Sequence, residues 1–403
     1  MSFYIFLIWL FILIGRPQDI FDFLQPLRLA LLFALISIIS TILSKKFIFF
    51  SEIIKIKEVK YYILFFFIMV FGIPFSYYKR ESFNFIFFLY LSNLLFFIIF
   101  TLEVNSFDKL KNTIFVICLS SFFYSFFSLS KGTFIFGRYF FGEMYDPNDL
   151  AYFFVSLLPF NIFFIVTREK FFKRLIAFFS AVFSLIIILL TGSRGGFLGI
   201  LNTILFLFFG NIFVIKFRYK VFSILIILAL IAVNYEKINT ERYLSLLKLD
   251  NDYNITSESG RLAIWKRAIK LGFKNSFTGV GVNCSAMAIG YARQSEGKIP
   301  KWQVIHNSFL QVFTEVGIFG FLLFMLIILR CVRTFARYKN IIPSNYELEQ
   351  HKSLCGLLYI AFLSQLICAF FLTQAYSIIF TLFFSLSVVT NLIFQENFNS
   401  NKT

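Results

Sequence analysis

Apolar runs of about twenty residues recur along the whole chain, separated by shorter polar stretches. About twenty residues is the length of α-helix that crosses the hydrocarbon core of a bilayer. The runs are continuous and do not alternate between polar and apolar residues, which excludes membrane β-strands. The sequence therefore predicts an all-α integral membrane protein.

The composition agrees with this class and excludes other functions. Of the 403 residues, 59% are hydrophobic and 15% are charged, whereas a soluble domain carries about 25% charged residues. The net charge of +17 fits a protein with anionic lipid neighbours or an anionic substrate. No soluble basic module is present to hold nucleic acid. The five cysteines form no CxxC pair, so we expect no disulfide, no metal site and no cofactor.

The hydropathy pattern predicts about twelve membrane helices. We place them at residues 3–14, 28–44, 61–76, 83–101, 112–130, 148–167, 175–191, 196–215, 221–235, 308–329, 353–372 and 377–394. The first run lacks a basic segment before it and is interpreted as a retained helix. If the helices alternate in direction, the four most basic loops fall on one side, including 45–60 and 330–339. By the positive-inside trend that side is the cytoplasm, so both termini are expected to be cytoplasmic in a bacterial inner membrane.

One long polar segment interrupts the apolar runs. It divides the chain into residues 1–235 with nine helices, an extracytoplasmic loop at 236–307, and residues 308–403 with three helices and a tail. Within the loop, residues 259–275 predict an amphipathic helix that Ser257 or Ser259 caps. Its residues Leu262, Trp265 and Ile269 share one face, which suits contact with the membrane surface.

Arg194 lies in the sequence TGSRGG, at the outer junction of two predicted helices. The glycines that follow allow a ligand to approach the backbone closely. The next helix directs its free N–H groups to the same place, which suits a phosphate or diphosphate. A tight helical hairpin with the arginine at the lipid headgroups explains the same residues equally well.

Arg261 lies one turn before Trp265, at the edge of the apolar face of the loop helix. It is a candidate for binding an anionic headgroup, with Trp265 as a supporting residue. The alternative is that the helix is a structural lid and Arg261 a simple lipid contact.

His306 is one of two histidines and stands at the end of the loop, beside Asn307 and Ser308, either of which could cap the next helix. The positive end of a helix disfavours imidazolium, so the ring is expected to stay neutral and to accept a proton. A histidine at the interface without a chemical role is the simpler alternative. Glu315 lies about two turns deeper, where an acid is a functional candidate by default or a partner for a neighbouring helix.

The segment 137–151 leads into the sixth predicted helix. Asp146-Pro147-Asn148 is a turn and helix-cap signal, although Arg138, Glu143 and Asp146 could also line a site. Trp302 is most simply an anchor at the membrane interface.

Taken together, these residues resemble the O-antigen ligase and polymerase superfamily, whose members share a Wzy-C-type domain. The resemblance rests on an ordered set of segments, each of them weak alone. The start RPQD is a looser match to the exosortase-associated O-glycosylation ligases. The matching segments are RPQD near the first helix, DPNDLAYFFVSLLP, TGSRGGFLG, GRLAIWKRAI, TGVGVN and HNSFLQVFTEVGIFGF.

The resemblance implies an activity that the residues alone do not name. Members of the superfamily transfer a glycan from an undecaprenyl-diphosphate carrier to a hydroxyl of a glycolipid, glycan or protein, without a metal and with inversion. Their arginines hold the diphosphate and their histidine activates the acceptor. On this chain those roles fall on Arg194, Arg261 and His306.

Alternatives remain beside the ligase. A repeat-unit polymerase of the same superfamily differs only in its acceptor, which no stretch of this chain reveals. A glycolipid or solute transporter is the alternative from another class. It predicts ionisable residues at mid-membrane and paired broken helices, and apart from Glu315 the runs carry few such residues. A scaffold of a secretion complex is a third possibility.

Overall fold

A computed structural model describes residues 1–142, 145–167, 169–210, 217–245, 253–340 and 346–400. The described chain is almost entirely helical, with one hairpin of two short strands, β1 (Thr133–Ile135) and β2 (Arg138–Phe140). Eight of its helical stretches are long and apolar enough to cross a membrane, and four shorter apolar helices accompany them. The all-α membrane fold is therefore confirmed, and these helices coincide in position with the twelve predicted runs.

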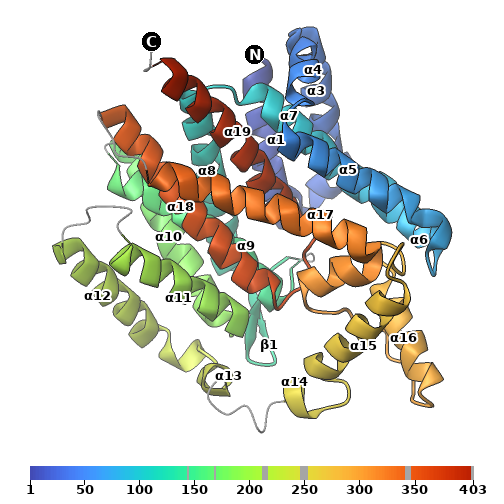
Figure 1. Cartoon of the computed structure of the whole chain (residues 1–403). Coiled ribbons are helices and arrows are strands. Elements are labelled where there is room, and N and C mark those ends of the chain that lie inside the picture. The colour runs from blue at the N-terminus through green and yellow to red at the C-terminus, as the bar shows by residue number, and fades with distance from the viewer. Residues whose placement is uncertain (143–144, 168, 211–216, 246–252, 341–345, 401–403) are drawn as a thin grey trace.

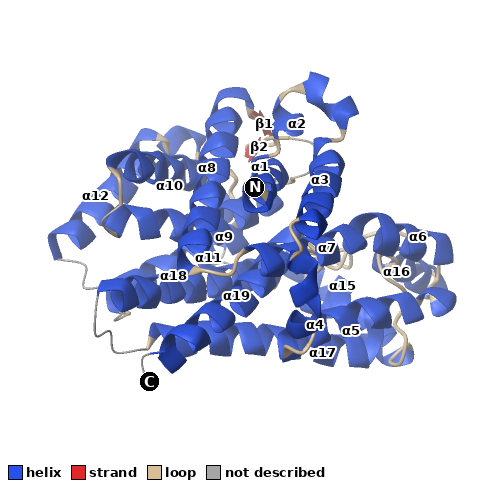
Figure 2. Cartoon of the chain, turned by 90° about the horizontal axis from the view of Figure 1, so that it is seen from above, coloured by secondary structure: helices blue, strands red, loops and turns tan. Residues whose placement is uncertain are grey.

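The membrane helices pack into one bundle (Figures 1 and 2). In helix α9, 78% of the apolar stretch is buried, because α8, α10, α11 and α18 surround it. Helix α3 packs mainly on α1, and only 11% of the apolar stretch that contains it is buried. The bundle consists of α1 (Ser2–Gly15), α3 (Leu29–Leu43), α5 (Lys57–Phe71), α7 (Leu91–Glu103), α8 (Phe107–Lys131), α9 (Pro147–Val166), α10 (Phe171–Leu190), α11 (Arg194–Phe209), α12 (Phe217–Val233), α17 (Ser308–Lys339), α18 (Tyr346–Ala369) and α19 (Ile378–Ser400).

Short elements complete the chain outside this bundle. They are α2 (Pro17–Ile20), α4 (Phe50–Ile53), α6 (Lys79–Asn84), which continues through a π-helical stretch (Phe85–Tyr90) into α7, and α13 (Thr240–Leu244), α14 (Tyr253–Thr256), α15 (Arg261–Lys274) and α16 (Ser285–Ser295). The last four lie between α12 and α17. In Figure 1, α13 and α14 lie at the end of the molecule opposite the N-terminus and the C-terminal end of α19.

The predicted end of the tenth helix at residue 329 is wrong. Helix α17 continues to Lys339, so the basic residues 330–339 are helical and do not form a loop. Arginine and lysine are good helix formers, and the Arg330 guanidinium bonds the Glu58 carboxylate on α5 at 3.0 Å. Hydropathy detects where lipid contact ends, but the helix extends past that point.

Helix α17 is broken near its start. Gly317 has φ of 77° and ψ of −174°, a combination that essentially only glycine adopts, within an otherwise regular helix. The turn at residues 276–281 packs against the break. It supplies backbone bonds from Val280 N–H to Thr314 C=O at 2.8 Å and from Gly281 N–H to Glu315 C=O at 3.1 Å. The glycine-rich sequence TGVGVN therefore fastens the polar segment to a membrane helix.

Helix α15 packs along α17 through a face that the sequence reading did not identify. Its residues Ile264, Ala268 and Leu271 are buried and form a small core with α16. Leu262 and Ile269 each remain 40% exposed, so the predicted membrane contact of that face stays a prediction. The predicted serine cap is absent, because Gly260 is the residue before the helix and makes no side-chain cap.

Candidate functional site

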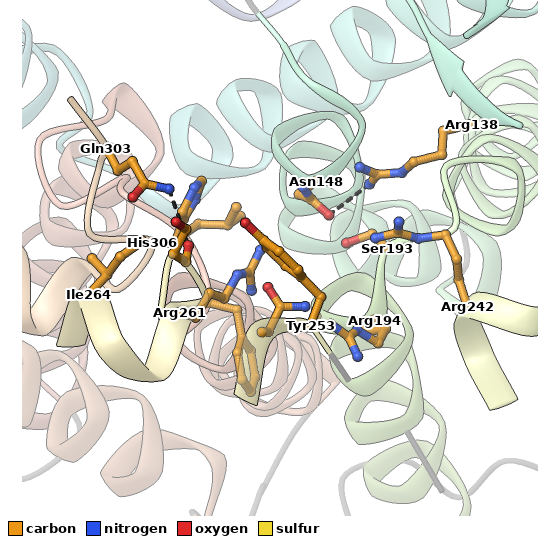
Figure 3. Close-up of a pocket in the computed structure, with 15 residues that line it drawn as sticks. Arg138, Asn148, Ser193, Arg194, Arg242, Tyr253, Arg261, Ile264, Gln303 and His306 are labelled. Carbon is orange, nitrogen blue, oxygen red and sulfur yellow. Dashed lines mark hydrogen bonds between the residues drawn. The ribbon is translucent and has the colours of Figure 1, made fainter. Parts of the chain in front are cut away.

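A cavity of about 240 Å³ opens at the end of the bundle opposite the termini. Figure 3 shows Arg138, Arg194 and Arg242 on one side of it and Arg261 and His306 on the other. Among the described residues, its walls are Arg138, Asn148, Ser193, Arg194, Gly195, Arg242, Tyr253, Asn254, Ser259, Arg261, Ile264, Gln303, His306, Phe371 and Leu372. Four of the predicted site residues thus converge from distant parts of the chain.

Arg194 is the first residue of α11. Ser193 caps this helix by accepting a bond from the N–H of Gly196 at 3.2 Å. The Arg194 guanidinium donates to the Ser245 hydroxyl at 3.3 Å, beside α13. Since Gly195 also lines the cavity, the positive end of α11 and its first side chain face the same space.

Arg138 reaches the cavity from strand β2. Its guanidinium donates to the Thr191 carbonyl at 3.0 Å and to the Asn148 side-chain oxygen at 2.8 Å. Burial, followed by the charges of Arg242 and Arg261, lowers its pKa to about 10. The positive charges of these arginines therefore repel one another around the cavity, and a bound anion would offset this repulsion.

Arg242 was missed by the sequence reading. It lies on the short helix α13, and its guanidinium donates to the Gly192 carbonyl at 3.2 Å. The Tyr243 hydroxyl holds the helix in place by donating to the Leu189 carbonyl at 2.9 Å. Nothing in the sequence around Arg242 signals this position, since five residues of helix inside a polar segment show no hydrophobic periodicity.

Arg261 is the first residue of α15 and lines the cavity next to His306. Trp265, one turn later, does not line it. Its indole N–H donates to the Ile305 carbonyl at 2.9 Å, and its ring packs edge-on against Phe370. Trp265 therefore fixes the backbone that carries His306.

His306 adopts φ of 52°, the left-handed region that non-glycine residues rarely occupy. The conformation is held because its N–H donates to the Thr373 hydroxyl at 2.8 Å, while Asn307 caps α17 by accepting from Phe309 and Leu310 N–H. Burial, followed by the charge of Arg261, lowers the pKa of the ring to about 4. The imidazole is therefore neutral near pH 7, as expected, although burial rather than the helix end is the main cause.

Asp146 and Glu315 are not among the described residues that line the cavity. Asp146 caps α9 by accepting from the N–H groups of Asn148 and Asp149 at 2.6 and 2.9 Å. Glu315 is buried and accepts from the Ser285 N–H at 3.2 Å, which joins α17 to α16. Glu143 lies outside the described residues.

A second cavity, of about 430 Å³, lies between α11, α17 and α18. Its walls are apolar apart from Asn202, and it shares Phe371 with the arginine cavity. No group of three or more His, Cys, Asp and Glu side chains suited to a metal ion occurs in the described part of the chain.

Comparison with known proteins finds a family match that covers part of this site. Residues 179–325 match the model of the Wzy_C family, described as O-antigen ligase. That range contains Arg194, Arg242, Arg261 and His306, while Arg138 precedes it. Among curated proteins, no match to the chain is found.

Proposed function

We propose, from the O-antigen ligase domain that residues 179–325 carry, that this chain is a membrane glycosyltransferase. It transfers a glycan from an undecaprenyl-diphosphate carrier to an acceptor hydroxyl. The site then lies on the outer face of the bacterial inner membrane, and both termini lie in the cytoplasm.

The observation that carries the proposal is the grouping of four arginines and a neutral histidine around one cavity. Guanidinium groups bind diphosphate oxygens through paired, charge-assisted hydrogen bonds. In a glycosyl diphosphate the diphosphate is the leaving group, so its negative charge grows as the bond to the sugar breaks. Preorganised arginines stabilise that charge, and removal of one such donor typically costs about 100-fold to 1,000-fold in rate.

His306 supplies the general base. The ring accepts the proton of the acceptor hydroxyl as its oxygen attacks the anomeric carbon, and the bond from that carbon to the diphosphate oxygen breaks on the opposite side. The products are a new glycosidic bond with inverted configuration, a free carrier diphosphate and an imidazolium. The proton later leaves to water.

The charge of Arg261 makes the base dependent on the donor. In the empty site this charge helps to lower the pKa of His306. A bound diphosphate offsets the arginine charges, so the pKa of the ring rises and the imidazole becomes a stronger base. Proton transfer is then favoured when the donor is in place.

The apolar cavity beside the site suits the carrier's hydrocarbon chain. It borders the arginine cavity at Phe371 and opens between α11, α17 and α18. A polyprenyl chain buried there leaves water at a gain of roughly 25 cal/mol for each Å² of apolar surface. The diphosphate and the polyprenyl chain of the donor would thus occupy two adjoining cavities.

Replacement of His306 tests the proposal. His306→Asn is preferable to alanine, because asparagine tolerates the left-handed backbone yet has no basic nitrogen. Loss of the general base is expected to reduce transfer by about 100-fold to 10,000-fold at an unchanged protein level. The assay is a gel of surface glycans from a deletion strain that expresses either form. A normal glycan profile with His306→Asn contradicts the proposal.

The same gel separates the acceptor classes. Long chains that remain on the carrier in the deletion strain indicate a ligase, and single repeat units without a ladder indicate a polymerase. An unchanged profile in that strain removes the glycan assignment and favours transport.

A further inference from the structure

Three aromatic side chains form an exposed row next to the cavity. The rings of Tyr77 and Tyr291 lie 6.4 Å apart between centroids, and those of Tyr291 and Trp302 lie 5.3 Å apart. Tyr77, Tyr291 and Trp302 are 41%, 48% and 56% exposed, respectively. Tyr77 lies two residues before α6, and Tyr291 is on α16, which lies beside α6 in Figures 1 and 2. We call these three residues the aromatic row.

The fold makes room for the Trp302 ring. A Cβ at Gly290 would lie 2.2 Å from its Cε3 atom, so only glycine allows the indole to lie against α16. The segment that carries Trp302 is also fixed. Arg293 donates to the Ile299 carbonyl at 3.1 Å, and Lys301 donates to the Ser259 hydroxyl at 3.1 Å. An exposed ring held in this way loses little entropy on binding a ligand.

One end of the row lies close to the arginine cavity along the chain. Trp302 is 56% exposed and does not line the cavity, whereas the next side chain, Gln303, lines it and donates to the Ser259 carbonyl at 3.2 Å. His306 follows four residues after Trp302, which limits the separation of their backbones to about 14 Å. A chain of a few sugar units can therefore extend from His306 to the row.

The surroundings of the row are aqueous in character. Lys298 pairs with Glu258 at 2.8 Å, and the Glu258 side chain is 70% exposed. Arg267 pairs with Glu296 at 2.8 Å on the neighbouring faces of α15 and α16. Exposed carboxylates are disfavoured at an anionic membrane surface, which attracts basic segments. This setting favours a water-soluble ligand over lipid.

We propose that the aromatic row binds a glycan chain that extends from the reaction site. Sugar rings carry an apolar C–H face that stacks on aromatic side chains, while their hydroxyls bond to polar groups at the edges of the row. The inference rests on the proposed glycosyl transfer and adds a subsite that holds sugar units beyond the one that reacts. It offers an alternative to the simplest sequence interpretation of Trp302, a membrane anchor.

The test compares Trp302→Ala with Trp302→Phe in purified full-length protein reconstituted in lipid. The probes are undecaprenyl-diphosphate donors from the native host, carrying either one repeat unit or a long chain, and acceptors with a short or a long glycan. For Trp302→Ala we expect KM for the long probe to rise about tenfold, the effect of losing about 1.4 kcal/mol of binding free energy. The increase in KM should be larger for longer glycans. Trp302→Phe keeps an aromatic face and should restore most of the binding.

The arms of the experiment identify the source of the chain. A length effect on the donor assigns the row to the donor glycan, and one on the acceptor assigns it to the acceptor glycan. Ile299→Ala is the matched control, since Ile299 is 80% exposed on the same segment and lies outside the row.

Two results overturn the proposal. One is an equal effect of Trp302→Ala on short and long probes. The other is a similar loss of membrane-inserted protein with Trp302→Ala and Ile299→Ala, which would identify a membrane anchor. Failure of the glycosyl-transfer assignment itself is recognised separately, because His306→Asn would then retain full transfer with every probe.

Discussion

Charged side chains are used in opposite ways at the two ends of the bundle. At the end with the N-terminus, the carboxylate of Glu103 is fully buried. It bonds the ammonium of Lys46 and accepts from the hydroxyls of Ser2 and Thr41 at 3.2 and 2.9 Å. At the other end, Arg138, Arg194, Arg242 and Arg261 surround a cavity of about 240 Å³.

The difference separates a charge that joins helices from charges that we propose bind a ligand. Glu103 is enclosed by donors from α1, α3 and the start of the following loop, so its bonds join helices. The arginines direct like charges to one volume and lower the pKa of Arg138 and of His306. Mutual repulsion opposes folding, and it is compensated when an anion binds.

The largest expected effect on folding is at the enclosed end. Glu103→Ala leaves the Lys46 ammonium without its carboxylate, and breaking such a pair costs about 3–5 kcal/mol. The lower end of that range applies, since the Lys46 side chain is 21% exposed. Thermal unfolding in detergent measures the loss, while transfer per folded molecule should stay unchanged. Glu258→Ala, at the exposed ion pair with Lys298, is the control and should lower the unfolding temperature far less.

Arg261→Ala, in contrast to Glu103→Ala, should lower activity and leave stability nearly unchanged. We expect transfer to fall by about 100-fold with little change in the unfolding temperature, because repulsion within the cavity is reduced. Initial rates with a lipid-linked donor measure the effect. Arg267→Ala, on the same helix but in an ion pair with Glu296 and outside the cavity lining, controls for loss of a positive charge. Equal rates for Arg261→Ala and wild type would show that the two ends do not differ in this way.

The pH dependence of transfer tests how the charge of Arg261 affects His306. His306 acts as a base only when neutral, so transfer is lost as pH falls through its pKa. For the free enzyme that pKa is about 4, and kcat/KM should decrease about tenfold for each pH unit below it. The corresponding limb of kcat should lie at higher pH, because bound diphosphate offsets the charge of Arg261. Coincident limbs in the two profiles would contradict the coupling.

The smallest effect is expected where the histidine backbone is held. Thr373→Val removes the hydroxyl that accepts the His306 N–H, a loss of about 1 kcal/mol. If this contact maintains the strained backbone of His306, its loss misplaces the imidazole, and kcat should fall roughly fivefold with a smaller change in KM. Thr373→Ser retains the hydroxyl and should retain the rate. A fall in stability without a change in kcat would assign Thr373 a purely structural part.

The membrane helices could be predicted because lipid imposes a simple rule. Each spanning segment must be apolar and about twenty residues long, and all the helices expected from hydropathy are present. The broken helix could not be predicted. Gly317 lies in an apolar run like other glycines of membrane helices, and its conformation depends on a turn about forty residues earlier in the chain.

The site was accessible in part. Arg194 stands at the junction of two predicted membrane helices, and Arg261 and His306 lie within the polar segment, so their position relative to the membrane could be inferred. Arg138 and Asp146 could not be distinguished, since a capping acid and a cavity arginine occur in the same short loop. Arg242 and the Thr373 contact depend on tertiary packing, which local sequence does not encode.

The break in α17 amounts to an exchange of backbone partners. In a regular helix the N–H of Ile318 would bond the carbonyl of Thr314. Here Ile318 N–H bonds the Ser276 carbonyl at 2.7 Å, and the Thr314 carbonyl receives Val280 N–H. Neither the helix nor the turn is complete without the other, so separating them would expose unpaired backbone groups. Amide hydrogen exchange at these positions should therefore occur through one cooperative opening. In this opening the polar segment separates from the bundle and the N-terminal turns of α17 unfold together.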